Sequence, residues 1–303
     1  MLNSVKKFLV TLLRVLILVG VGYTILAPVI GMAVNSIAST EDLYNPMMFL
    51  FPKYPTWEKY VLVIKRMGYF ATMARDLLYT VFLTAIQVFV CSMVGYGFAR
   101  FNFKFKGLLF AGVVLMITIP AHTIMLPLYM TFKTFDPFGI VTALKGTPGV
   151  MGTVVPMFLM TILGCGVRSG LYIYIFNQFF RGLPKEIEEA AFVDGAGVWY
   201  TYFRIMLVNA MPAVITVAVF SLVWQFNDTF YAKLFLISEN VVISKKISSL
   251  AGVLANQDKI LNVSIQQQHV NAGILLVVLP ILILYLILQK RFIEGVERSG
   301  IVG

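Results

Sequence analysis

Aromatic, amide and carboxylate side chains gather in one short stretch, "WQFNDTFY", which runs from Trp224 to Tyr231. Trp224 offers a flat apolar ring, and Asn227 and Asp228 offer polar groups three and four residues later. This combination suits the faces and hydroxyl groups of sugar rings, because ligand sites combine apolar surface with a few placed polar groups. The same residues also fit an aromatic belt at the outer membrane interface. Both interpretations remain open.

Two other polar residues interrupt apolar sequence. Arg168 lies in "GCGVRSGLYIYIF" and His122 in "IPAHTIMLP". An arginine in the middle of a membrane costs about 2.5–3.5 kcal/mol on insertion scales and usually faces a bundle interior or a water-filled cavity. Alternatively, the span ends earlier and Arg168 extends to the interface. His122 either faces the same pathway or packs inside the bundle. Around Arg168, Gly166 and Gly170 form a pair of small residues that predicts close helix contact.

The segment "LPKEIEEAAFVDGAG" carries start and stop signals for a short helix, predicted over 184–195. Pro184 suits the first helical position. Three glutamates follow in the first turns, where the helix dipole favours anions. Gly195 suits a left-handed stop. Ile187, Ala190 and Ala191 have the spacing of one helical face. Two alanines on that face predict a low surface that another protein can approach closely; a plain connector between spans is the alternative.

The sequence lacks the motifs of several chemistries. It contains no G-x-x-x-x-G-K-[ST] phosphate loop and no H-E-x-x-H zinc motif. It also has no G-x-S-x-G nucleophile motif. Cys91 and Cys165 each lie in an apolar run and are expected to be small packing residues. We therefore expect no catalytic residues, no metal site and no cofactor bound by this chain itself.

The composition is that of a membrane protein. The 303 residues are 59% hydrophobic and only 13% charged, and the mean hydropathy is +0.86. Soluble domains carry about 25% charged residues. The net charge of +10 comes from bases spread between apolar runs, not from one basic patch. This distribution argues against a nucleic-acid partner and favours membrane-flanking lysines and arginines.

Six apolar segments are long enough to cross a bilayer as helices, since a span needs roughly 20 residues. Continuous apolar runs argue against a barrel, whose strands alternate. Prolines within or beside the runs, including Pro120 and Pro212, predict kinks. The predicted spans are 15–36, 77–98, 108–130, 150–176, 205–226 and 270–288.

Charge in the short connections predicts the orientation. The loop 99–107, "ARFNFKFKG", is purely basic, and the N-terminus carries Lys6, Lys7 and Arg14. The positive-inside rule places such segments in the cytoplasm. An even number of spans then puts both termini and the loop 177–204 on the cytoplasmic side. The first apolar run continues uncharged from Val15 to Thr40, so we expect an uncleaved span and not a signal peptide.

The stretch "EEAAFVDGAGVWYTYFRIMLVNAMP" resembles the EAA loop of integral membrane subunits of bacterial ABC importers. The family pattern is Glu-Ala-Ala, three residues, Gly, nine residues, then Ile-x-Leu-Pro. The chain departs from it at Val208, and a proline appears only at Pro212. Flanking segments, including "GYGFARFNFKFKG" and the tail "QKRFIEGVERSGIVG", resemble carbohydrate-uptake permeases of the maltose-transporter type. The resemblance covers 76–303. Matching positions are Glu189, Ala190, Ala191, Gly195, Ile205 and Leu207.

The resemblance implies an all-α, six-span permease of the type I ABC importer fold, with a cytoplasmic coupling helix. It implies an N-terminal segment, first span and external loop over 1–75, a permease domain over 76–289 and a cytoplasmic tail over 290–303. The implied partners are a second homologous permease, two ATPase subunits that hold ATP and Mg, and an extracytoplasmic sugar-binding protein. Residues expected to couple to the ATPase are Glu189, Ala190, Ala191, Asp194 and Gly195; those expected along the substrate pathway are Trp224, Asn227, Asp228, Arg168 and His122.

Two other functions compete with a carbohydrate importer subunit in the bacterial cytoplasmic membrane. A stand-alone secondary transporter is disfavoured because the sequence shows no internal repeat and no carboxylate in mid-span except the peripheral Asp228. A permease for a non-sugar solute is the other alternative. Co-purification of an ATPase with this chain would separate the first alternative from an importer.

Overall fold

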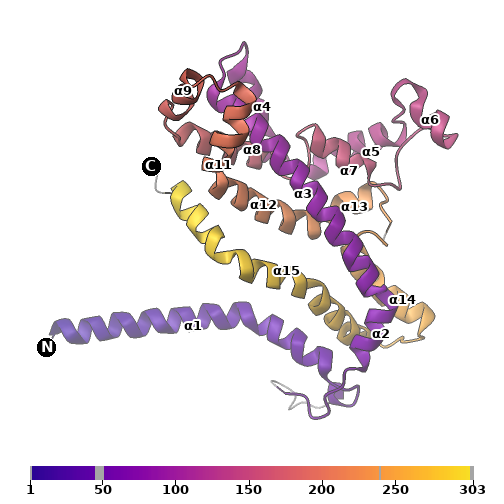
Figure 1. The fold of residues 1–303 in the computed structure, drawn as a ribbon. Coiled ribbons are helices and arrows are strands. Elements are labelled where there is room, and N and C mark those ends of the chain that lie inside the picture. Colours follow the sequence, from indigo (N-terminus) through magenta and orange to yellow (C-terminus); the bar gives the residue numbers. More distant parts are fainter. Residues whose placement is uncertain (1, 45–50, 239, 301–303) are drawn as a thin grey trace. The chain divides into compact units, whose positions relative to one another are not determined.

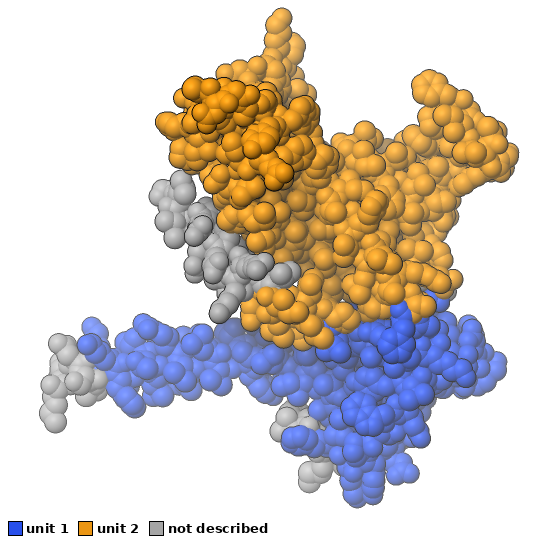
Figure 2. Space-filling view, in the orientation of Figure 1, with its two compact units in different colours: residues 1–70, 246–279 blue, residues 71–245, 280–303 orange. Residues whose placement is uncertain are grey.

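The computed structural model describes residues 2–44, 51–238 and 240–300, and within these ranges the chain is helical. Their single β contact is an isolated antiparallel bridge between Ala38 and Pro55. The chain divides into two compact units. Unit 1 comprises residues 1–70 and 246–279, and unit 2 comprises residues 71–245 and 280–303 (Figure 2).

Unit 1 brings the N-terminal helix together with a segment from late in the sequence. It contains α1 (Leu2–Ile37), the short η1 (Asp42–Tyr44) and α2 (Glu58–Met67). It also holds most of α14 (Ile243–Gln257) and the first half of α15 (Val263–Gly300). The Ser36 hydroxyl lies 2.8 Å from the Tyr60 hydroxyl and links α1 to α2.

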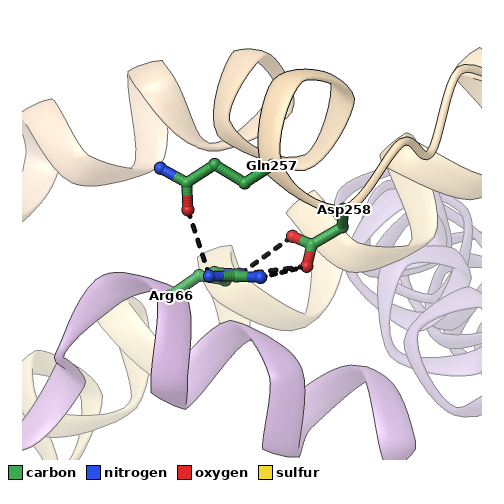
Figure 3. A network of polar contacts seen from close by, with 3 residues as sticks. All are labelled: Arg66, Gln257 and Asp258. Atoms are coloured by element: carbon green, nitrogen blue, oxygen red, sulfur yellow. Dashed lines mark hydrogen bonds and ion pairs between the residues drawn. The ribbon is translucent and has the colours of Figure 1, made fainter.

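An ion pair fixes the end of α14 within unit 1. The Arg66 guanidinium, on α2, binds the Asp258 carboxylate through Nε and NH2, and its NH1 donates to the Gln257 side chain at 3.1 Å (Figure 3). Hydrogen bonding to Asp258 raises the pKa of Arg66. The fork of the guanidinium matches a carboxylate, which gives the contact a defined geometry. The pair therefore holds the start of the α14–α15 connection against α2.

Unit 2 is built on the long helix α3 (Tyr69–Arg100), which enters it at residue 71. Helix α8 (Ser169–Gly182) packs against α4 (Lys106–Thr118) and α12 (Met211–Phe226). Their core is aromatic and includes the fully buried Tyr172, Phe176 and Phe180. The remaining elements are η2 (Ala121–Ile124), α5 (Met125–Lys133), η3 (Pro137–Gly139), α6 (Ile140–Lys145), α7 (Val155–Ile162), α9 (Glu186–Val193), α10 (Val198–Tyr200), the π-helix η4 (Thr201–Met206), α11 (Leu207–Asn209) and α13 (Phe230–Leu234) (Figure 1).

Three helices of the described residues are long and apolar enough to span a membrane: α1, α3 and α15. Two bent pairs also pass the test together. Helix α4 and the segment from Ala121 to Lys145 meet at 104°, and the segment from Val198 to Asn209 meets α12 at 78°. The first bend falls at Pro120 and the second beside Pro212, which confirms the kinks expected there. The described part of the chain thus holds up to five candidate spans by length and composition.

The predicted fourth span, 150–176, is not one helix. It is divided into α7 of 8 residues and α8 of 14, and neither is long enough alone to cross a bilayer. Between them Gly164 has φ of 72° and Arg168 has φ of 60°. Left-handed backbone at these positions ends one helix and starts the next. A hydropathy window counts apolar residues and does not register this reversal.

Candidate functional site: a charged and aromatic cavity and the α9 end of unit 2

A cavity of about 1150 Å³ opens within unit 2 where the helices are broken. Three segments line it: 116–135, which includes the α4–α5 bend; 159–171, which includes the α7–α8 break; and 224–231, which follows α12. Broken helices free backbone polar groups, and in membrane proteins such backbone is tolerated where it is buried or lines a water-filled space. The irregular segments therefore account for the position of the cavity.

The structure brings all five predicted pathway residues to this one cavity. They come from η2, the α7–α8 break and the end of α12, and they are His122, Arg168, Trp224, Asn227 and Asp228. Segments more than 100 residues apart in the sequence thus meet at one place. Their role in binding a solute stays a prediction.

Arg168 and Trp224 form the most distinctive contact of the cavity. The Arg168 guanidinium carbon lies 4.3 Å from the centroid of the Trp224 ring. A cation over an aromatic face is attracted by the ring quadrupole. Both side chains are exposed, Trp224 to 45%. No ion pair of Arg168 occurs among the described residues. The cavity therefore presents a ring and a cation that a solute can reach.

Asn227 and Asp228 bind the backbone of their own segment. The Asn227 side-chain amide donates to the Val223 carbonyl at 2.9 Å. The Asp228 carboxylate accepts from the backbone N–H groups of Tyr231 and Ala232 at 3.4 and 3.2 Å, which caps α13. Burial raises the pKa of Asp228 to about 6, against the opposing effect of these amide hydrogen bonds. Asp228 thus shapes the end of the cavity more than it offers a free carboxylate.

His122 packs against Phe230 with ring centroids 4.5 Å apart. It lines the cavity, and the contact joins η2 to the start of α13. His122 therefore combines the two predicted roles: its ring packs against Phe230, and the residue also lines the cavity.

A buried polar network behind the cavity was missed by the sequence analysis. Gln87, on α3, donates to the Val167 carbonyl at 2.6 Å and to the Ser169 hydroxyl at 2.9 Å. Its carbonyl oxygen accepts from Ser221 and Gln225 of α12 at 2.7 and 2.9 Å. The network ties α3 and α12 to the α7–α8 break. The available signal was a glutamine inside the apolar run 77–98, because buried polar groups require partners.

Close approach of α8 to α4 confirms the expected helix contact at Gly170, whereas Gly166 lies in the break and approaches Thr161 of α7. A methyl group on Gly170 would lie 2.9 Å from Met116 Cβ and from the Val113 carbonyl of α4. On Gly166 it would lie 2.8 Å from the Thr161 hydroxyl. Such contacts are shorter than side chains tolerate, so both positions require glycine.

At the α9 end of unit 2, the predicted helix over 184–195 forms as α9, from Glu186 to Val193, and Gly195 has the left-handed φ of 80° expected for its stop. The predicted alanine face is divided. Ala190 is exposed, whereas Ala191 is 5% exposed and Ile187 packs against the core of unit 2. The outward surface includes Glu189, Asp194 and Val193, of which Val193 is 87% exposed and was not singled out by the sequence.

Glu188 anchors α9 to the end of α3. Its carboxylate lies 2.8 Å from Arg100 Nε and accepts from the Tyr96 hydroxyl. Arg100 also donates to the Leu183 carbonyl at 2.8 Å, just before α9. Both charged side chains are less than 10% exposed. A buried pair with additional hydrogen bonds has little freedom to rearrange, so α9 and α3 are joined firmly.

Comparison with known proteins agrees with this architecture. The family model described as "Binding-protein-dependent transport system inner membrane component" matches residues 87–298. Protein LplC of Bacillus subtilis is 26% identical over 96% of this chain and 94% of its own length. The arabinooligosaccharides transport system permease protein AraQ of Bacillus subtilis is 24% identical over 92% and 91%. A chain in the crystal structure of a bacterial ABC transporter involved in the import of the acidic polysaccharide alginate has a TM-score of 0.76 at 18% identity, over 95% of this chain and 98% of that one.

Proposed function

Because the chain belongs to the family of inner membrane components of binding-protein-dependent transport systems, we propose that it is a permease subunit that moves a carbohydrate, in particular an oligosaccharide, into the cell. The chain itself is a transport subunit and not an enzyme. Its relatives include a permease whose name specifies arabinooligosaccharides. The share of sugar contacts made by this chain depends on the partner permease.

The observation that carries the proposal is the cavity beside the α7–α8 break. Its volume of about 1150 Å³ exceeds the 300–1,000 Å³ typical of sites for drug-sized ligands. Trp224 supplies a platform for an apolar sugar face, and Arg168 supplies donors for oxygen atoms. The cavity lies among broken helices, which have two segments that can move separately. These features suit a solute of several rings that is bound and then released.

The proposed assembly contains four further chains. Two ATPase subunits bind ATP and Mg, a second homologous permease completes the pathway, and an extracytoplasmic binding protein delivers the sugar. Both termini and α9 lie on the cytoplasmic side, as the basic loop 99–107 favours. The tail, 295–303, is proposed to make a second contact by reaching between the ATPase subunits; its last residues, 301–303, lie outside the described residues.

Helix α9 is the proposed coupling helix. Its outward residues dock on an ATPase subunit, and Glu188 passes movement to α3 through Arg100. Along α3, thirteen residues separate Arg100 from Gln87, which is about 20 Å at 1.5 Å per residue. Gln87 binds the backbone at the α7–α8 break. A continuous set of contacts therefore joins the docking surface to the cavity.

The test uses the assembled transporter in proteoliposomes. Uptake of a labelled arabinooligosaccharide should require ATP and the binding protein, and the ATPase should co-purify with this chain. Ala190→Glu adds charge to the exposed docking surface and should abolish co-purification and uptake. Ala143→Glu, the same change at an exposed alanine of α6, is the control and should leave co-purification intact.

Two results would overturn the proposal. Uptake by the chain alone, without nucleotide, would favour a secondary transporter. ATP-dependent uptake of a non-sugar solute, with none for a panel of oligosaccharides, would leave the permease assignment standing and reject the carbohydrate.

A further inference from the structure

A second, smaller cavity in unit 1 has an unusual chemical lining. Its volume is about 320 Å³, and it lies between the end of α1, Leu43 of η1 and the first turns of α15. Five of its seven lining residues carry an amide or a hydroxyl group, and none is charged. The lining residues are Asn35, Leu43, Val263, Ser264, Gln267, Gln268 and Asn271.

The register of α15 explains how these groups gather. Ser264, Gln267, Gln268 and Asn271 are spaced i, i+3, i+4 and i+7, so they share one face of the helix. Asn262 supports this turn, since its side-chain oxygen accepts from the backbone N–H of Ser264 at 2.9 Å. The Gln267 side chain donates to Asn271 at 2.9 Å, which orients the two amides.

The Gln268 side chain has a carbonyl oxygen that lacks a hydrogen-bond donor. The residue is 2% exposed, and its amide nitrogen donates to the Ser39 carbonyl at 3.4 Å. Its carbonyl oxygen is buried without a partner. A buried acceptor left unpaired is costly, and such atoms in native proteins are normally satisfied by protein, water or a ligand. Gln268 lines the cavity, so a bound O–H group that reached this oxygen as the ligand settled would satisfy it.

The absence of charged lining residues and the volume of the cavity limit the kinds of ligand that it can bind. The lining has no carboxylate or imidazole for a metal ion and no cation for a phosphate or carboxylate. The volume corresponds to about ten water molecules at roughly 30 Å³ each, well beyond a single bridging water. It falls at the lower end of the range for small-molecule sites. Amides and hydroxyls both donate and accept, as do the hydroxyl groups of a sugar.

We propose that this cavity binds one neutral polyhydroxylated ring, such as the pyranose of a hexose, through Gln268, Gln267 and Asn271. The site is separate from the transport cavity, which is formed by unit 2 alone. Free sugar and the headgroup of a neutral glycolipid share this chemistry, because each presents the same ring.

The test labels the purified transporter complex with a photoactivatable, diazirine-bearing glucose and maps the modified peptides by mass spectrometry. Labelling should fall within 35–43 or 263–271, and an excess of free glucose should suppress it. Glucuronate at the same concentration should compete less, because no cation lines the cavity. Peptide mapping separates this site from any labelling in unit 2, so a failure of sugar uptake and a failure of this site are distinguishable.

Three variants of α15 sharpen the test. Gln268→Met removes the unpaired acceptor at similar volume, and Asn271→Leu removes a second amide. Each should reduce labelling about fivefold, as expected for one lost hydrogen bond. Gln266→Met, one residue away and outside the lining, should label as the wild type does. Co-purification of each variant with its partner subunits checks that it folds.

Competition also separates the two sources of the ring. Suppression by free glucose supports a soluble sugar, and suppression only by glucosyl diacylglycerol in nanodiscs supports a lipid headgroup. The proposal is overturned if the wild type is not labelled at these peptides, which would leave the cavity to water. It is also overturned if Gln268→Met and Asn271→Leu label like the wild type, or if glucuronate competes as well as glucose.

Discussion

At the α9 end of unit 2, Arg100 and Glu188 are buried and paired, whereas Arg168 in the cavity is exposed and lies against the Trp224 ring. At the α9 end, Arg100 and Glu188 approach to 2.8 Å and each has a further hydrogen bond. A contact that transmits movement needs a fixed geometry. A cavity that binds and releases a solute needs groups that the solute can reach. The difference fits the two tasks proposed for the two regions.

The largest expected effect comes from breaking the buried pair. Arg100→Met leaves the Glu188 carboxylate buried without its cation, and breaking such a pair by removing one partner costs about 3–5 kcal/mol. We expect a large fall in the thermal unfolding midpoint of the purified complex and loss of ATPase co-purification. The double variant Arg100→Met, Glu188→Met should recover part of the stability, because neither charge is then left alone.

Arg181→Met provides the matched control. Arg181 is exposed in the last turn of α8, close in sequence to α9. Its removal should leave the unfolding midpoint and co-purification nearly unchanged. If Arg100→Met behaves like Arg181→Met, the anchor between α9 and α3 has no mechanical importance and the comparison of the two regions fails.

Local signals explain what the sequence predicted of these regions. The acidic first turn and Gly195 belong to α9 itself, and the helix forms within two residues of the predicted ends. The anchor was not predictable in the same way. Arg100 and Glu188 are 88 residues apart, and neither carries a local signal of its partner. The helix was therefore foreseen, but the side of it that faces inward was not.

The cavity, too, was only partly predictable from the sequence. Its polar residues were recognisable by type, because charged and amide groups are rare in apolar runs. Their meeting depends on the α7–α8 break, where Gly164 and Arg168 adopt positive φ. The apolar composition of 150–176 predicted one continuous span instead. Hydropathy reports which residues tolerate lipid, and backbone reversals at glycines lie outside what it measures.

The next prediction tests whether the start of α8 must pack closely against α4. A Cβ on Gly170 would lie 2.9 Å from backbone and side-chain atoms of α4. Gly170→Ala should therefore destabilise unit 2 by about 1–3 kcal/mol, the usual cost of overpacking. Gly112→Ala is the control on α4, since nothing lies within 4 Å of the added atom. Thermal unfolding of both variants should show a loss only for Gly170→Ala; equal midpoints would mean that α4 and α8 separate without cost.

A smaller effect is expected in the cavity itself. Trp224→Leu removes the ring beneath Arg168, and cation–π contacts at exposed sites correspond to about a two- to fivefold change in an equilibrium constant. The concentration of sugar that gives half-maximal uptake should rise by at least this factor, with assembly unchanged. Trp199→Leu, 63% exposed on α10, is the matched control. Equal shifts in the two variants would remove Trp224 from the proposed site.

A further effect is a pH dependence at the end of the cavity. Burial raises the pKa of Asp228 to about 6 from its usual 3.8. Between these values the folded chain holds a proton that the unfolded chain has released, so stability falls as pH rises through this window. The stabilising contribution is complete below pH 4 and is lost above about pH 6. The unfolding midpoint of the wild type should therefore decline more between pH 4 and 6 than that of Asp228→Asn, which does not titrate at this position. Asp194→Asn, on the exposed stop of α9, should keep the wild-type slope. A slope that persists in Asp228→Asn would mean that a group other than Asp228 causes the pH dependence.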